Sequence, residues 1–226
     1  ELSVAATNAP ASTVVSGALT AVDALEQMLS TRGVGVVRLR TYDIRGKQVL
    51  WVPMFAANDK ESVVMTLQTL KAQWPPDATV VGILNNRRDR GRRAELFAAM
   101  STDELRPFLD RTVLFGAYED SVEKTILAGG VPSAQVHKMG DTVQPSLDQI
   151  LDKIASLIPG ERGVLIGMVN IHTHQAEMLM EFFEHEAGED HVDELAAPMD
   201  PERQPESRRR LRWAAARRGV AADEAT

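Results

Sequence analysis

Five arginines and one aspartate lie within the seven residues 87–93, directly after an apolar run that ends in two asparagines. Guanidinium groups bind carboxylates and phosphates through paired hydrogen bonds, and a neighbouring carboxylate can hold one guanidinium in position. We call residues 87–93 the arginine loop. Its composition favours binding of an anionic ligand. The alternative is a solvated helix start with an internal ion pair.

Other polar side chains also follow apolar runs. Asn58 and Asp59 can hydrogen-bond a ribose or a ligand amine, or simply cap a helix, and a helix start suits both roles. His172 and His174 are two residues apart and lack nearby carboxylates or cysteines, so we expect no metal there. Ligand contact by His172 is the more plausible role. No Ser/His/Asp arrangement or carboxylate pair is legible, so we assign no catalytic residue.

Composition limits the classes of function. The chain has 226 residues and a formal net charge of -7, which disfavours a nucleic-acid partner because such binding requires a basic surface. It has no cysteine, so a disulfide framework and a cysteine-ligated zinc site are excluded. No apolar run is long enough to cross a bilayer, which is compatible with a cytoplasmic protein.

Helical and strand patterns alternate along the chain. Three-to-four spacing of apolar residues predicts a helix over residues 12–29, and a further helix starts near Asn58, with Glu61 placed to close a capping box. A hairpin is predicted over 34–41 and 47–55, short strands over 79–84, 112–115, 135–137 and 164–169, and helical segments over 95–100, 105–109, 122–128, 147–157 and 175–185.

This alternation predicts an α/β fold, with an open, mostly parallel sheet and flanking helices. In such sheets ligands bind beyond the carboxyl ends of the strands. The loops expected at that edge begin at Asn58, at Asn85, at Gly116, at Gly140 and at Asn170, and they hold most of the polar residues. We therefore expect them to converge on one site.

The two ends of the chain differ from this middle part. In residues 1–33 one helix is predicted, with little around it to pack against. Such a lone helix is what a truncated preceding domain would leave. Residues 184–226 contain an acidic segment followed by a basic one, with few apolar residues, which predicts a charged flexible tail or a helix that orders on a partner. Contact of Leu211 and Trp213 with anionic lipid is a third reading of this tail.

Four motifs together resemble the carboxyl-terminal part of the poly-gamma-glutamate synthase ligase subunit, the CapB/PgsB family, which is similar to the Mur ligases. They are FAAND at 55–59, ILNNRRDRGRR at 83–93, LFG at 114–116 and GMVNIH at 167–172. The resemblance covers roughly residues 8–183. It implies a Rossmann-like domain of the Mur ligase carboxyl-terminal type.

The resemblance also implies a function. Such a ligase activates a carboxylate as an acyl phosphate with ATP and joins it to the amine of glutamate. ATP and Mg²⁺ would be bound mainly by a P-loop domain upstream of this chain. Glutamate or poly-gamma-glutamate, the P-loop domain, membrane synthase subunits and further copies of the chain are the expected partners. The expected location is the cytoplasm, at the inner face of the membrane.

Site residues follow from the resemblance position by position. Asn86, Arg87, Asp89 and Arg90 fall in the family's arginine motif and would bind the glutamate carboxylate or ATP phosphates. Asn58, Asp59, Asn170 and His172 would lie near the nucleotide. The chain departs from the family pattern where Val169 and Thr173 replace glycines and where Ala117 replaces an acidic residue. A non-catalytic module that binds an acidic ligand or a synthase partner is the competing interpretation.

Overall fold

A computed structural model describes residues 2–9, 12–17, 19–32, 39–55, 59–72, 74–140 and 144–194. By its internal contacts the chain divides into two compact units, residues 1–184 and 185–226. The sheet and the candidate site both belong to the first unit. Asn58 and the tail beyond residue 194 lie outside the described residues, so the predictions made for them are not tested.

A six-stranded sheet forms the centre of the first unit, in the order β3-β4-β8-β5-β6-β7. Its strands are β3 (Arg40–Ile44), β4 (Lys47–Pro53), β5 (Thr79–Asn86), β6 (Arg111–Gly116), β7 (Val136–Lys138) and β8 (Arg162–Val169). Only the β3–β4 hairpin is antiparallel, and the other four pairings are parallel. The predicted α/β fold with an open, mostly parallel sheet is confirmed.

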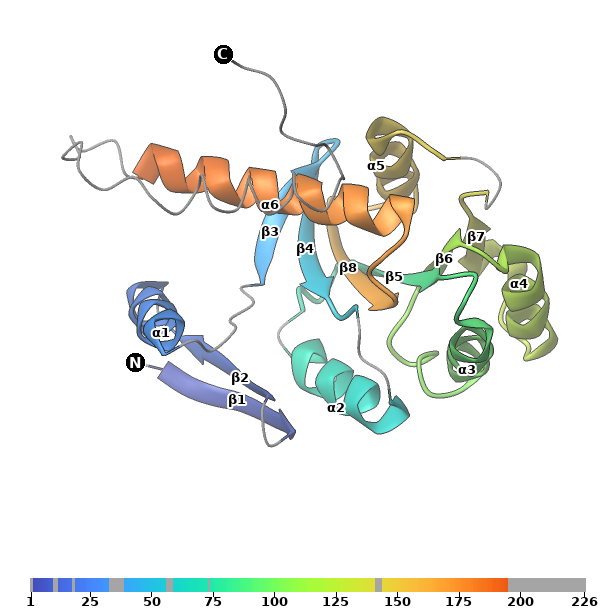
Figure 1. The fold of residues 1–226 in the computed structure, drawn as a ribbon, viewed down its shortest axis with the longest axis horizontal. Coiled ribbons are helices and arrows are strands. Elements are labelled where there is room, and N and C mark those ends of the chain that lie inside the picture. Colours follow the sequence, from blue (N-terminus) through green and yellow to red (C-terminus); the bar gives the residue numbers. More distant parts are fainter. Residues whose placement is uncertain are drawn as a thin grey trace, which may run out of the picture. The chain divides into compact units, whose positions relative to one another are not determined.

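Helices cover both faces of this sheet (Figure 1). α2 (Lys60–Lys71), α3 (Gly91–Thr102) and α4 (Glu119–Ala128) bury their apolar sides in one core together with Leu84, Leu114 and Ile166. α5 (Leu147–Ser156) and the part of α6 (His174–Glu194) up to Glu184 lie on the opposite face. There the ring of Phe183 in α6 stacks on Trp51 of β4, with ring centroids 4.4 Å apart.

The carboxyl ends of β5 and β8 form the switch point of the sheet. The two strands are neighbours in parallel register, with Asn85 opposite Val169. The chain leaves β5 toward α3 on one face and leaves β8 toward α6 on the other. Loops that part in this way open a crevice between them, and this is where parallel sheets bind ligands.

The amino-terminal prediction is wrong for its first residues. Residues 12–17 form strand β2 (Ser12–Gly17), which pairs with β1 (Leu2–Ala9) in a separate two-stranded sheet, and α1 (Leu19–Thr31) begins only after it. The apolar residues of this stretch fit helical spacing, but Thr13, Val14 and Val15 are consecutive and β-branched, which favours a strand. Pairing with β1 satisfies the backbone of these residues as a strand, so the β preference prevails over the helical spacing.

Further details of the helices differ from prediction. The residue that caps α2 is Asp59, whose carboxylate accepts a hydrogen bond from the Ser62 backbone N–H at 2.8 Å. Residues 103–108 form turns instead of a helix. α4 starts at Glu119, three residues earlier than predicted. α6 continues to Glu194, so the first part of the predicted flexible tail is helical.

Candidate functional site

Two buried asparagines join the carboxyl ends of β5 and β8. The backbone N–H and the side-chain amide of Asn170 both donate to the Asn85 carbonyl, at 3.2 and 3.0 Å. The Asn85 side-chain amide in turn donates to the Asn170 carbonyl, and its oxygen accepts from the Thr173 hydroxyl. Neither asparagine is more than 4% exposed. The reciprocal bonds fix the two strand ends, and with them the loops that follow.

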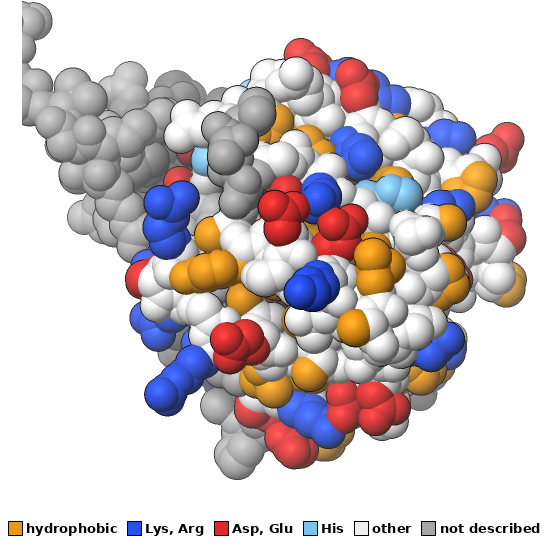
Figure 2. All heavy atoms as spheres, turned by 90° about the vertical axis from the view of Figure 1, so that its right-hand side faces the viewer, with side chains coloured by type: hydrophobic (Ala, Val, Ile, Leu, Met, Phe, Trp, Pro, Cys, Tyr) orange, Lys and Arg blue, Asp and Glu red, His pale blue; other side chains and the backbone are white. Residues whose placement is uncertain are grey.

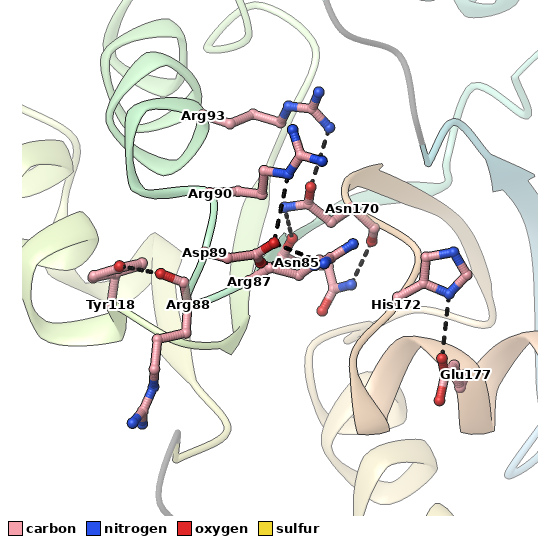
Figure 3. A network of polar contacts seen from close by, with 10 residues as sticks. All are labelled: Asn85, Arg87, Arg88, Asp89, Arg90, Arg93, Tyr118, Asn170, His172 and Glu177. Atoms are coloured by element: carbon pink, nitrogen blue, oxygen red, sulfur yellow. Dashed lines mark hydrogen bonds and ion pairs between the residues drawn. The ribbon is translucent and has the colours of Figure 1, made fainter. Parts of the chain in front are cut away.

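Arg93 connects the arginine loop to this pair (Figure 3). One of its terminal nitrogens donates to the side-chain oxygen of Asn170 at 3.1 Å and more weakly to the Val169 carbonyl at 3.4 Å. Both acceptors are uncharged. Arg93 is half-buried and has no carboxylate partner among the residues that the structure describes. A guanidinium that is partly removed from water usually has an anion beside it.

Arg87 and Asp89 form an internal ion pair, as the alternative interpretation of the loop proposed. Two nitrogens of the Arg87 guanidinium donate to the two oxygens of Asp89, at 3.0 and 2.8 Å. Desolvation acts to raise the pKa of Asp89, but the hydrogen bonds from Arg87 and the charges of Arg87 and Arg90 outweigh it, so the pKa is lowered. Arg90 is 3.7 Å from the same carboxylate. One aspartate therefore serves two arginines.

The backbone of the arginine loop is fixed from the neighbouring strand. The Tyr118 hydroxyl, in the loop after β6, donates to the carbonyl of Arg88. Figure 3 shows the Arg88 side chain pointing away from the asparagine pair, whereas Arg90 and Arg93 both extend toward Asn170. Spacing of three residues at the start of α3 places Arg90 and Arg93 on one side of the helix.

Two residues at this edge have left-handed backbone conformations that their side chains disfavour. Val169 has a φ of 80° and Tyr118 a φ of 65°. For a β-branched residue such as Val169 this is a strained conformation, costing about 1–3 kcal/mol. The resemblance expected glycine at position 169, and glycine adopts this conformation without strain. The chain thus keeps the glycine-type backbone although the glycine itself is replaced.

Three other predicted site residues, Asn86, Asp59 and His172, have local partners. Asn86 is 1% exposed, and its amide donates weakly to the Leu84 carbonyl at 3.3 Å, so it is part of the packed strand end. Asp59 caps α2, and hydrogen bonds from the Ser62 backbone and side chain lower its pKa. His172 is half-exposed and lies 3.3 Å from the Glu177 carboxylate. Among the described residues, neither Asp59 nor His172 contacts the arginine loop.

The sequence assigned no specific site role to Arg93, Asn85, Thr173 or Glu119. The spacing of Arg90 and Arg93 is the one signal that was available for Arg93. Glu119 is 3% exposed and accepts from the backbone N–H groups of Met139 and Gly140. Its partners lie 20 and 21 residues along the chain, so nothing in the local sequence marks them.

Within the described residues there is no group of three or more His, Cys, Asp or Glu side chains arranged to hold a metal ion. The described helices include none with the length and apolar character needed to cross a membrane.

Comparison with known proteins identifies the family. A sequence model of the poly-gamma-glutamate synthase CapB C-terminal domain matches residues 39–186, about two thirds of the chain and the whole of the six-stranded sheet. No curated protein matches the chain. The four motifs that suggested the family fall within the matched range. The chain belongs to the family of poly-gamma-glutamate synthase CapB C-terminal domains.

Proposed function

We propose that this chain is the carboxyl-terminal domain of an ATP-dependent amide ligase that extends poly-gamma-glutamate. Its part in the reaction is to bind anionic groups of the reactants and to hold them for attack by the amine of glutamate. The observation that carries this proposal is the convergence of the arginine loop with Asn170 at the switch point of the sheet, in a chain of this family.

The chemistry of amide formation explains why arginines are useful here. A carboxylate is first phosphorylated by ATP, and the amine then attacks the acyl phosphate and releases phosphate. Both steps bring negatively charged groups together, so their rates depend on fixed positive charges and on positioning. Arginine binds carboxylate and phosphate oxygens in a defined geometry, as this requires. No group in the described part of the chain is arranged as a nucleophile with its base.

ATP and its Mg²⁺ are expected to bind mainly to a P-loop domain elsewhere in the enzyme. Arg90 of the arginine loop suits the phosphate end of such a nucleotide, because a guanidinium group is matched to phosphate oxygens. Closure of this domain over the nucleotide-bearing domain would bring the loop to the reacting groups. On this proposal the enzyme acts at the cytoplasmic face of the membrane, with synthase subunits and further copies of itself as partners.

Removing the charge of Arg90 tests the proposal. In the full-length enzyme, Arg90→Ala is expected to reduce glutamate-dependent ATP turnover at least about tenfold, because a charged hydrogen bond to the reacting groups is lost. The measurement is release of inorganic phosphate with and without glutamate. Turnover that stays within twofold of the wild type would remove the arginine loop from the mechanism.

A further inference from the structure

The cations of the arginine loop differ in what they bind within the protein. The charge of Arg87 is balanced by Asp89, because both oxygens of that carboxylate accept hydrogen bonds from Arg87. Arg90 shares that carboxylate only at 3.7 Å. Among the described residues, Arg93 hydrogen-bonds only uncharged oxygens, through a single nitrogen. Arg90 and Arg93, the two arginines that extend toward Asn170, therefore carry positive charge that no described carboxylate balances at close range.

Several cations elsewhere in the first unit have anionic partners. Lys138 lies between the carboxylates of Asp120 and Glu123, at 2.8 and 2.9 Å, and these raise its pKa. Arg45 donates to Asp148 and Asp152. Basic and acidic side chains are also interspersed over the face seen in Figure 2. Arg93 has no carboxylate partner among the described residues, and it lies at the carboxyl edge of the sheet, where parallel sheets bind ligands.

The geometry at Arg93 leaves donors free for a ligand. A guanidinium has five N–H donors, and the bonds to Asn170 and Val169 come from one nitrogen. The guanidinium is oriented by these bonds, since Asn170 is itself held by Asn85. Arg90 extends to the same region, so a second fork faces the same space (Figure 3). Two guanidinium groups that extend to one region, with Asp89 bound to Arg87 and 3.7 Å from Arg90, favour an added oxyanion.

We propose that Arg90 and Arg93 together form an oxyanion subsite, with Asn170 as the group that orients Arg93. The Arg87–Asp89 pair is the internal support of the loop and does not bind the ligand. This proposal rests on the ligase function proposed above and specifies which residues of the loop contact the substrate. The ligand is a carboxylate, from glutamate or the end of the polymer, or a phosphate of the nucleotide.

Arg93→Gln in the full-length enzyme tests this subsite, with Arg92→Gln as the matched control. Arg92 lies in the same turn, is exposed, and has no side-chain partner among the described residues. Both variants remove one positive charge, so they share any general electrostatic effect. Arg93→Gln is expected to raise one KM about tenfold, because a charged hydrogen bond is lost. Arg92→Gln is expected to change both KM values less than twofold.

Separate titrations of glutamate and of ATP distinguish the two sources of the oxyanion. A rise confined to the KM for glutamate assigns the subsite to a carboxylate, and a rise confined to the KM for ATP assigns it to a phosphate. Arg93→Lys keeps the charge but loses the fork, so its KM should rise by about threefold. Equal effects of Arg92→Gln and Arg93→Gln, or a fall in kcat with both KM values unchanged, would overturn the subsite.

A binding measurement separates failure of the subsite from failure of the ligase function. If the wild-type enzyme shows no glutamate-dependent ATP hydrolysis, the ligase proposal fails. Calorimetry with poly-gamma-glutamate and with tripolyphosphate then decides the subsite alone: binding by the wild type that is weakened tenfold by Arg93→Gln supports it, and no binding by the wild type overturns it. Melting temperatures of the variants confirm that each remains folded.

Discussion

The two edges of the central sheet use polar residues in different ways. At the amino edge, the Asp110 carboxylate accepts from the Val80 backbone N–H at 2.8 Å, and Lys71 donates to the Pro107 carbonyl at 2.8 Å. Each of these bonds joins the segment before β6 to an element earlier in the chain. At the carboxyl edge, two buried asparagines and a half-buried arginine form a network that joins two loops, and Arg93 has no carboxylate partner among the described residues. The first arrangement stabilises the fold, whereas the second lies where we propose that an anion binds.

The largest effect is expected at Gly116, where the loop after β6 passes the end of β5. Its φ is 78°, and an added Cβ would lie 2.2 Å from the Asn86 carbonyl oxygen. Gly116→Ala should therefore cost about 4 kcal/mol of unfolding free energy, combining strain and overlap. Gly130 has a φ of 83° with open space around it, so Gly130→Ala should cost only about 1 kcal/mol. Denaturant unfolding measures both, and equal costs would contradict the close approach.

For the polar residues of the two edges we expect a smaller loss of unfolding free energy than for Gly116→Ala. Asn85→Ala should cost about 3 kcal/mol, because it leaves the buried Asn170 carbonyl without its side-chain donor and the Thr173 hydroxyl without its acceptor. Asp110→Ala should cost about 1 kcal/mol, since one partly buried N–H loses its acceptor. Urea unfolding of the two variants tests this. A larger loss for Asp110→Ala would reverse the interpretation of the edges.

Backbone strain at Val169 gives the third prediction. Val169 and Val164 are both fully buried in β8, but only Val169 has a positive φ. Val164→Gly removes buried side-chain contacts and relieves no strain. Val169→Gly removes buried contacts too, but it also relieves the backbone strain at position 169. Val169→Gly should therefore cost at least about 2 kcal/mol less than Val164→Gly. The same unfolding assay measures both variants, and indistinguishable losses would show that the left-handed valine is not strained.

The smallest effect concerns the internal ion pair of the arginine loop. The pKa of Asp89 lies below its ordinary value, so the stability that the pair contributes is fully present above the unfolded pKa and is lost as the pH falls through the folded pKa. Titration of the Asp89 carboxyl carbon by NMR should give a midpoint below the 3.8 of an unperturbed aspartate, and Arg87→Gln should raise it. A midpoint at or above 3.8 in the wild type would contradict the pairing.

The sequence was sufficient for the fold class because most elements here have strong local patterns. Residues 80–84 are continuously apolar, as a strand covered on both faces requires, and Ser146 with Gln149 forms a capping box at the start of α5. Strand β2 was missed because the strand that it pairs with, β1, lies in residues 2–9, and these residues show no periodicity of their own. Local patterns predict elements, but they do not reveal partners.

The candidate site could be predicted only in outline for the same reason. The position of the arginine loop after a buried strand was legible, and so was the asparagine of the last loop. That Arg93 binds Asn170, 77 residues away, depends on the strand order, which places β8 directly beside β5. Side-chain positions are likewise needed to tell Arg87, which pairs with Asp89, from Arg90 and Arg93, which extend toward Asn170.

The central place of β8 in the sheet has a consequence for how the protein folds. Among the described residues β8 is the last strand in sequence, but it lies between β4 and β5, which do not pair with each other. During synthesis the β3–β4 hairpin and the β5–β6–β7 group therefore share no sheet hydrogen bonds until residue 162 and those after it have emerged. Insertion of β8 completes the sheet and brings Asn170 to Asn85 in the same step, so the candidate site is assembled last.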